Sequence, residues 1–336
     1  VNTGLHHQRI GYFREAGNYL YAFGTYYWPD DPSVFLQNGE VFQSADHGST
    51  WRSISLPEKS SNVLVNGTTI FVVLSGTVYR SIDFGTTWIP ASTGQLKPAV
   101  RNLVAFDSTL FAITQDSILH RSTDNGDHWT ALPIGAPLYS FWSLGKIGST
   151  IFVFIPNKGI LRSSDNGDHW ESADTGLPLV YWYSHYSVND SILFVTTSST
   201  TYRTADLGRN WSILTTDTTK LNASLIFVEN KSIFIRTYTN KVYRSMDNGI
   251  TWKEIQVNLQ DQPLNGLVSV GTTLFAYNED EILRSTDNGD TWTAVFQGIT
   301  NSQIAVLTVT DSIVLVSTQS DGVFRSSDKG ITWQKV

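Results

Sequence analysis

Aromatic side chains gather with polar ones at three places in the sequence. One is the stretch Tyr26-Tyr27-Trp28, which is followed by a proline, and the others surround Trp142 and Trp182. An aromatic face can stack on the C–H face of a sugar or pack in a protein interface, while neighbouring Asp, Asn, His and Arg side chains form hydrogen bonds. The sequence therefore predicts a binding surface for a glycan or a protein partner. We expect this surface to use Tyr26, Tyr27, Trp28, Trp142, Tyr181, Trp182, His185 and Arg9.

Catalysis is the alternative chemistry for the same part of the protein. A glycoside hydrolase needs two carboxyl groups about 5–10 Å apart, and Asp31 and Asp321 could supply them. A polysaccharide lyase needs a base such as His185, with a tyrosine and an arginine near it. No residue spacing ties these groups together, and solvated loop charges also explain the carboxylates. The preferred interpretation is therefore a non-catalytic, lectin-like or protein-binding molecule, with a glycan-cleaving enzyme as the alternative.

The elements that must position these residues come from a repeat. A segment close to Ser-x-Asp-x-Gly-x-Thr-Trp, first seen at Ser44–Trp51, occurs eight times, and its tryptophans follow one another at intervals of 37 to 41 residues. Between the copies lie short runs rich in Val, Ile, Thr and aromatic residues, bounded by turn residues, which predict four strands per repeat. The sequence therefore predicts an all-β fold, a single eight-bladed β-propeller over residues 1–336, with four antiparallel strands per blade.

Each shared position of the segment has a structural role in a turn between the third and fourth strands. Glycine permits a positive φ, the aspartate accepts hydrogen bonds from the turn, and the tryptophan can wedge between blades. An arginine precedes the segment in seven blades. A residue present in every blade points in every radial direction and cannot converge on one ligand, so these positions are structural. The shared aspartates are Asp46, Asp83, Asp124, Asp165, Asp206, Asp247, Asp287 and Asp328.

Function is therefore expected where the repeat deviates. The second-to-third strand loops lie at the end of each blade opposite the shared turns and are free to vary. The interval from Trp333 through the termini to Trp51 spans 54 residues, against 41 in most others, and it contains Trp28. We also expect the two ends of the chain to meet between the last and first blades, with Val1–Leu5 along the last strand.

The repeat resembles the Asp box, or bacterial neuraminidase repeat, over essentially the whole chain. That β-propeller family includes sialidases, sortilin-type receptors, xyloglucan-active glycosidases and a photosystem assembly factor. The resemblance implies the fold and the turn chemistry but not the activity. Sialidases of the family carry a Phe/Tyr-Arg-Ile-Pro motif, whereas Tyr12-Phe13-Arg14-Glu15 lacks the Ile-Pro. A sialidase is therefore not expected, and a protein assembly or interaction scaffold is a further alternative.

Composition excludes several function classes. The net charge is −7, with no basic stripe for nucleic acid, and no apolar run approaches the ~18 residues of a membrane span. The absence of cysteine excludes a disulfide framework and a cysteine zinc site. We expect no metal and no cofactor, and a monomer. A chain without cysteine, rich in Thr, Ser and Asn and beginning at Val1, suggests a processed protein that is secreted, extracellular or periplasmic.

Overall fold

The computed structural model of the chain forms an all-β, eight-bladed β-propeller. Eight four-stranded antiparallel sheets follow one another, each built from four consecutive strands, and we number these blades in chain order. The described residues are 5, 10–25, 36–56, 62–91, 96–135, 144–155, 158–178, 184–189, 192–197, 200–215, 221–229, 231–259, 262–295, 303–310 and 312–336. This part of the chain holds no helix long and apolar enough to cross a membrane.

The chain divides into two compact units of four blades each. The first comprises Val1–Trp142 and Gly298–Val336, so the last blade belongs with the first three. Blade 1 holds β1 (Tyr12–Ala16), β2 (Tyr19–Thr25), β3 (Leu36–Ser44) and β4 (Arg52–Ile54). Blade 2 holds β5 (Asn62–Asn66), β6 (Thr69–Leu74), β7 (Thr77–Ser81) and β8 (Ile89–Pro90). Blade 3 holds β9 (Val100–Phe106), β10 (Thr109–Thr114), β11 (Leu119–Ser122) and β12 (Thr130–Ala131), and blade 8 holds β29 (Ile304–Thr310), β30 (Ile313–Thr318), β31 (Val323–Ser326) and β32 (Gln334–Lys335).

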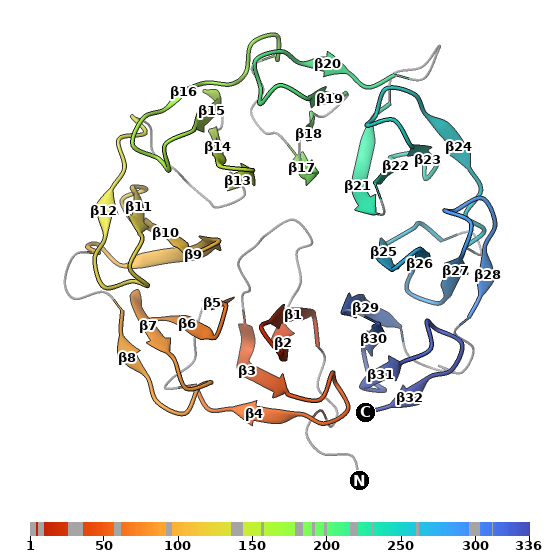
Figure 1. Cartoon of the computed structure of the whole chain (residues 1–336), viewed down its shortest axis with the longest axis horizontal. Helices are drawn as coiled ribbons and strands as arrows, with labels where there is room; N and C mark the ends of the chain where they lie inside the picture. Colours follow the sequence, from red (N-terminus) through yellow and green to blue (C-terminus); the bar gives the residue numbers. More distant parts are fainter. Residues whose placement is uncertain are drawn as a thin grey trace. The chain divides into compact units, whose positions relative to one another are not determined.

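The second unit, Ser143–Gln297, holds blades 4 to 7. Blade 4 comprises β13 (Leu144–Ile147), β14 (Thr150–Ile155), β15 (Gly159–Ser163) and β16 (Glu171–Ser172), and blade 5 comprises β17 (Ser184–Asn189), β18 (Ile192–Thr196), β19 (Thr201–Thr204) and β20 (Ser212–Ile213). Blade 6 comprises β21 (Ala223–Glu229), β22 (Ser232–Thr237), β23 (Val242–Ser245) and β24 (Lys253–Ile255), and blade 7 comprises β25 (Gly266–Val270), β26 (Thr273–Tyr277), β27 (Ile282–Ser285) and β28 (Thr293–Ala294). Within each unit the first strands of neighbouring blades lie side by side, and the fourth strands lie outermost (Figure 1).

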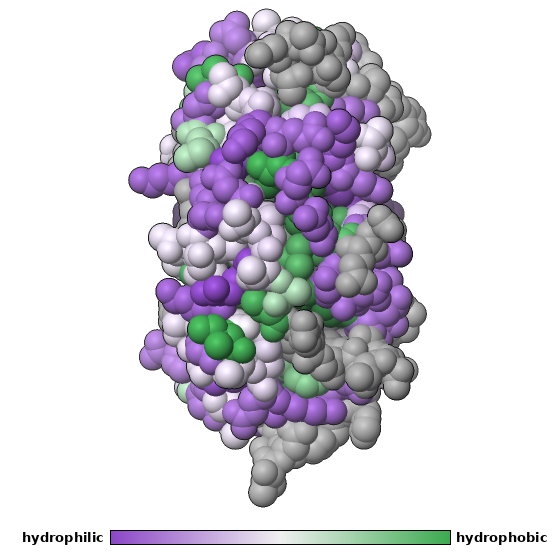
Figure 2. Space-filling view, turned by 90° about the vertical axis from the view of Figure 1, so that its right-hand side faces the viewer, coloured by the Kyte–Doolittle hydropathy of each residue, from purple (hydrophilic) through white to green (hydrophobic). Residues whose placement is uncertain are grey.

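The second strand of each blade forms the core. Its residues are apolar in a continuous run rather than in alternation, which is the pattern of a strand buried on both faces. A large aromatic ring occupies its centre in seven blades and is almost fully buried: Tyr21, Phe71, Phe111, Phe152, Phe194, Phe234 and Phe275. The fourth strands are short and mostly exposed, and the side of the molecule that carries β24 and β28 is mostly hydrophilic, with hydrophobic residues in a few small areas (Figure 2).

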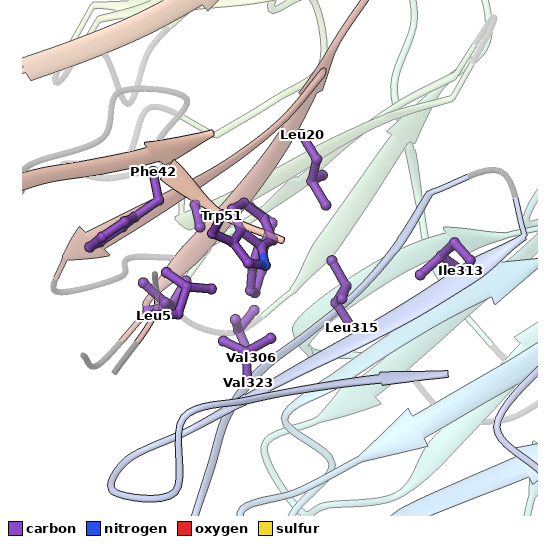
Figure 3. Close-up of a cluster of buried hydrophobic side chains, with 11 residues drawn as sticks. Leu5, Leu20, Phe42, Trp51, Val306, Ile313, Leu315 and Val323 are labelled. Atoms are coloured by element: carbon purple, nitrogen blue, oxygen red, sulfur yellow. The ribbon is translucent and has the colours of Figure 1, made fainter. Parts of the chain in front are cut away.

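The last blade packs against the first, as the sequence predicts. Trp51 lies at the centre of a buried cluster that joins Leu5 and Phe42 to Val306, Leu315 and Val323 (Figure 3). The hydroxyl of Ser317 in β30 donates to the carbonyl of Ile10 at 2.7 Å. Blade 1 and blade 8 are therefore held together by apolar packing and by a hydrogen bond to backbone, within one unit.

The Ser-x-Asp-x-Gly segments, called box turns from here on, make equivalent hydrogen bonds in every blade, with a histidine or asparagine in place of the threonine side chain in blades 3 to 5. Asp83 is representative. Asp83 Oδ2 accepts from the Thr87 hydroxyl at 2.6 Å, and Oδ1 accepts from the Thr87 backbone N–H at 2.8 Å and from the Ser81 hydroxyl at 2.7 Å. The hydroxyl of Thr87, followed by its backbone N–H, lowers the pKa of Asp83 to about 2. The equivalent threonines of blades 7 and 8 lower the pKa of Asp287 and Asp328 in the same way. Hydrogen bonds to a carboxylate favour its charged form.

These lowered pKa values make the protein less stable in acid. Because the pKa in the folded state lies below that of the unfolded chain, the unfolded state binds more protons as the pH falls from about 4 to about 2. The stabilisation is complete above the unfolded pKa and is lost across this window. Urea denaturation at a series of pH values should show the midpoint falling below pH 4. Thr87→Val, which removes one donor to Asp83, should weaken the dependence, and an unchanged midpoint from pH 5 to pH 2.5 would contradict it.

Arginines in the third strands form hydrogen bonds to the box turn of the next blade. In five blades the guanidinium donates to the carbonyl of the residue before the box-turn glycine of the following blade. The donors are Arg80, Arg162, Arg203, Arg244 and Arg325, and the acceptors are Asn125, Leu207, Asn248, Asn288 and His47. This supports the structural interpretation of the repeated arginines, because their donors are directed at backbone rather than at a common centre.

Candidate functional site

Most residues that the sequence analysis singled out lie outside the described residues. These are Arg9, Tyr26, Tyr27, Trp28, Asp31, Trp142, Tyr181 and Trp182. The proposed ligand surface that they would form stays a prediction, as does the pairing of Asp31 with Asp321. Two of the residues can be placed: Asp321 is half-buried in the β30–β31 turn, where its N–H donates to the Thr318 hydroxyl, and His185 lies in β17.

In the described part of the second unit, polar side chains replace apolar ones at one end of most of the second strands. The four strands of a blade run up and down, so the connection from the second to the third strand lies opposite the box turn. Two positions after the central phenylalanine of the second strand, blade 4 has Phe154, and the next blades have Thr196, Arg236 and Tyr277. In the first unit the same position is filled by Phe23, Val73, Ile113 and Ser317. Arg236 is thus the only charged residue there in eight blades.

Four of the first strands have a β-bulge near their start, which lies at this same end of the blades. In β17 the register with β18 skips His185, and in β21 the register with β22 skips Ser224. The skipped residues in β9 and β29 are Arg101 and Ala305. A bulge leaves one residue out of the ladder and re-aims it, and bulges are frequent next to functional sites. His185 therefore occupies in blade 5 the register position that Ser224 occupies in blade 6.

Ser224 and Arg236 form a hydrogen-bonded pair. The Ser224 hydroxyl accepts from Arg236 Nε at 2.9 Å and lies 3.0 Å from the backbone carbonyl of Arg236, to which it can donate. Arg236 Nη1 donates to the carbonyl of Leu264, in the segment that leads into β25 of blade 7. The guanidinium therefore lies at the junction of blades 6 and 7, whose first strands β21 and β25 are neighbours (Figure 1).

The charge of Arg236 is not compensated. Burial lowers the pKa of this guanidinium, and the only other group that acts on it is the Tyr238 side chain. Its two hydrogen-bond partners, Ser224 and Leu264, are both neutral, and no carboxylate of the described residues pairs with it. An unpaired charge that is half-buried is costly and uncommon in a site without function.

Tyr238 adds an exposed aromatic ring to this position. Its side chain is 58% exposed, in the turn between β22 and β23. The turn is well ordered, because the Thr237 N–H donates to the Lys241 carbonyl at 2.9 Å and the Lys241 N–H donates to the Thr237 hydroxyl at 3.2 Å. The ammonium of Lys241 is paired with Glu254 at 3.0 Å, so it does not compete with Arg236 for an anion.

Glu229, in β21 of the second unit, is a half-buried carboxyl group that is hydrogen-bonded to a serine. Burial raises the pKa of Glu229, which would suit a general acid. Its partner is the Ser269 hydroxyl at 2.5 Å, and no second carboxylate acts on it. Among the residues that the structure describes, no three His, Asp or Glu side chains come together where they could hold a metal ion.

Comparisons with known proteins agree with the fold. Residues 158–266 match the family described as sortilin, neurotensin receptor 3, and residues 41–141 match the DUF6242 β-propeller domain. Over residues 158–266 the chain is therefore similar to the sortilin-type, BNR-like β-propellers. The resemblance predicted from the repeat is therefore confirmed. No curated protein sequence matches the chain significantly.

Solved structures extend the likeness over nearly the whole chain. YCF48 from Cyanidioschyzon merolae is 14% identical, with a TM-score of 0.56 and coverage of 96% of each chain. YCF48 bound to a D1 peptide is 16% identical, with a TM-score of 0.55, and covers 82% of this chain and 96% of its own. The computationally designed Ika8 protein is 9% identical, with a TM-score of 0.66 and coverage of 96% and 97%. At these identities the likeness shows the β-propeller fold.

Sequence reasoning missed Arg236 and Tyr238, although a signal was present. When the second strands are aligned on the central phenylalanine, Ser232–Thr237 is the only one with a charge in its apolar run. Tyr238 follows directly in the variable loop. Both residues deviate from the repeat, as the sequence analysis requires of functional residues, but they are neither tryptophan nor histidine.

Proposed function

We propose that this protein is a non-catalytic binding propeller that holds a segment of a partner protein at the end of its blades opposite the box turns. The observation that carries the proposal is that blade 6 holds, two positions apart in the chain, a half-buried Arg236 without a carboxylate partner among the described residues and an exposed Tyr238. Arginine and tyrosine are enriched among the residues that dominate the binding energy of protein interfaces. The box turns, which we take to be Asp boxes, would then serve the fold and leave the opposite end for the ligand.

A protein ligand is supported over a glycan by two further points. YCF48, which has the same fold, has been seen with a bound peptide. In addition, a charged guanidinium is a better partner for a peptide carboxylate than for a neutral sugar. The aromatic residues predicted from the sequence, such as Trp182, would enlarge the same binding surface, because His185 and Ser224 share a register position in adjacent blades. A secreted or periplasmic location is part of the proposal.

Binding assays with matched variants test this function. The full chain should enrich peptides from a random dodecapeptide display library and should bind no member of a glycan array. For a selected peptide, Tyr238→Ala should weaken binding by about tenfold or more, as expected for a residue that dominates an interface. Met246→Ala, which alters a 67% exposed side chain in the box turn of the same blade, should leave the affinity within about twofold.

Each alternative has its own outcome in these assays. Glycan binding that Trp28→Ala or Trp182→Ala abolishes, without peptide binding, would replace the proposal with a lectin. New reducing ends or unsaturated products from polysaccharides would replace it with an enzyme. Equal losses for Tyr238→Ala and Met246→Ala would show that the peptide does not use this end of blade 6.

A further inference from the structure

We infer that Arg236 is a carboxylate-binding residue, whose free guanidinium edge receives a carboxylate of the bound segment between blades 6 and 7. The inference rests on the proposed function for the source of the carboxylate, which is a peptide. The recognition itself depends only on the residues around Arg236, so that it can be tested with a simple carboxylate.

The donors of Arg236 are only partly used. A guanidinium has five N–H donors in one plane. One, on Nε, is directed at the Ser224 hydroxyl, and one, on Nη1, at the Leu264 carbonyl. The remaining donors, one on Nη1 and two on Nη2, have no partner among the described residues. The Nη1 and Nη2 donors form the end of the fork, which matches the two oxygens of a carboxylate.

Three of the arginines that precede the box turns have a carboxylate partner, whereas Arg203 and Arg325 donate to backbone carbonyls. Arg80 pairs with Asp127 at 2.7 Å, Arg162 with Glu171 at 2.8 Å and Arg244 with Asp290 at 3.0 Å. Their side chains are between 6% and 14% exposed, so each buried charge is compensated within the protein. Arg236 also lacks a carboxylate partner among the described residues, and burial lowers its pKa. A ligand carboxylate would supply the missing charge.

The guanidinium is held in place before any ligand arrives. Ser224 is the bulged residue of β21, and its hydroxyl contacts both the Nε and the backbone carbonyl of Arg236. The Leu264 carbonyl fixes Nη1 from the neighbouring blade. Because these contacts restrict the rotamers of Arg236, less side-chain entropy remains to be lost when an anion binds.

A carboxylate fits the local charge better than a phosphate or a nucleic acid. Among the described residues of this loop, Lys241 is already paired with Glu254, so Arg236 supplies a single unpaired positive charge there. The chain carries a net charge of −7, which disfavours polyanions. One guanidinium edge matches the single charge of a carboxylate, whereas phosphate backbones are bound by several cations.

Arginine side-chain NMR tests the site without knowledge of the natural ligand. In the ¹⁵N-labelled full chain, Arg236→Met identifies the Nε–H resonance of Arg236 by its loss. Sodium acetate, added at constant ionic strength against sodium chloride, should shift this resonance in a saturable manner. Ser224→Ala should weaken the acetate affinity several-fold, while Arg52→Met, on the outer strand β4 of the first unit, should not change it. A resonance of Arg236 that acetate does not shift more than the other arginine resonances would overturn the inference.

A second arm separates this inference from the proposed function. A peptide selected by display should lose about tenfold in affinity when its carboxylates are amidated, and Arg236→Lys, which keeps the charge but loses the fork, should cause a similar loss. Acetate binding at Arg236 without any peptide binding would support the site and overturn the proposed function. Peptide binding that neither Arg236→Met nor amidation weakens would support the function and overturn the site.

Discussion

Replacing Trp51 with alanine should lower the free energy of unfolding by about 3–5 kcal/mol, the range for loss of a large aromatic side chain from a core. Trp51 is 5% exposed and lies between the first and last blades, against Val306, Leu315 and Val323 (Figure 3). Its indole N–H also donates to the Gly48 carbonyl at 3.1 Å. The substitution would leave a cavity where the two ends of the chain meet, and chemical denaturation would measure the loss.

Trp88 provides the matched control, because it occupies the same position in blade 2. It is only partly buried, and its indole N–H donates to the Ser55 carbonyl at 3.1 Å. Trp88→Ala should cost about half as much, since less apolar surface returns to water. If Trp51→Ala were no more destabilising than Trp88→Ala, the packing of blade 8 on blade 1 would not be what closes this unit.

The fold could be predicted from the sequence because its signals are local and repeated. The spacing of Trp51, Trp88 and their equivalents fixes the length of a blade, and the Asp and Gly of each box turn fix a tight connection. The contacts between side chains of neighbouring blades could not be predicted from the sequence. The sequence shows an arginine such as Arg80 before seven of the eight turns, but not that its guanidinium reaches the Asn125 carbonyl one blade later. That contact depends on the separation and twist of two sheets, which no local pattern encodes.

The candidate site was harder to predict for a different reason. A search for tryptophan and histidine outside the repeat passes over Arg236, because arginine is common elsewhere in every blade. The unusual feature is its register, in a second strand where the other blades have uncharged residues. The bulge that brings Ser224 to it is visible only in the pairing of β21 with β22. By contrast, the sequence analysis singled out His185, and the backbone pairing places it in blade 5 at the register position that Ser224 has in blade 6.

The hydrogen bonds explain why the two ends of a blade have different roles, one structural and one proposed to bind a ligand. At the box turns, the aspartate oxygens accept from their own serine and threonine, and the glycine-preceding carbonyls accept from an arginine of the neighbouring blade. These groups have few donors or acceptors left for a ligand. At the opposite end of blade 6, Arg236 has donors without a partner among the described residues, and Tyr238 is exposed. Binding at that end would therefore leave the contacts between blades intact.

Gly208→Ala should destabilise the second unit by about 2–5 kcal/mol, because it adds a contact to a strained backbone. Gly208, in the box turn of blade 5, has φ +81°, which costs a residue with a Cβ about 1–2 kcal/mol. A Cβ at Gly208 would also lie 2.7 Å from the Ala173 carbonyl oxygen of blade 4, which already accepts from the Trp211 indole. Backbone cannot move aside as a flexible side chain can, so the close approach adds a cost that is typical of an overpacked core.

Gly176→Ala separates the two contributions. Gly176 has φ +90°, but a Cβ there would meet no atom within 4 Å, so alanine should cost only the backbone strain of about 1–2 kcal/mol. The difference between the two variants in urea denaturation therefore measures how tightly the box turn of blade 5 is pressed against blade 4. Equal losses for Gly208→Ala and Gly176→Ala would mean that the box-turn glycine serves the turn alone. A larger loss for Gly208→Ala would show that the shared glycine also sets the distance between blades, because any larger residue would push the two sheets apart.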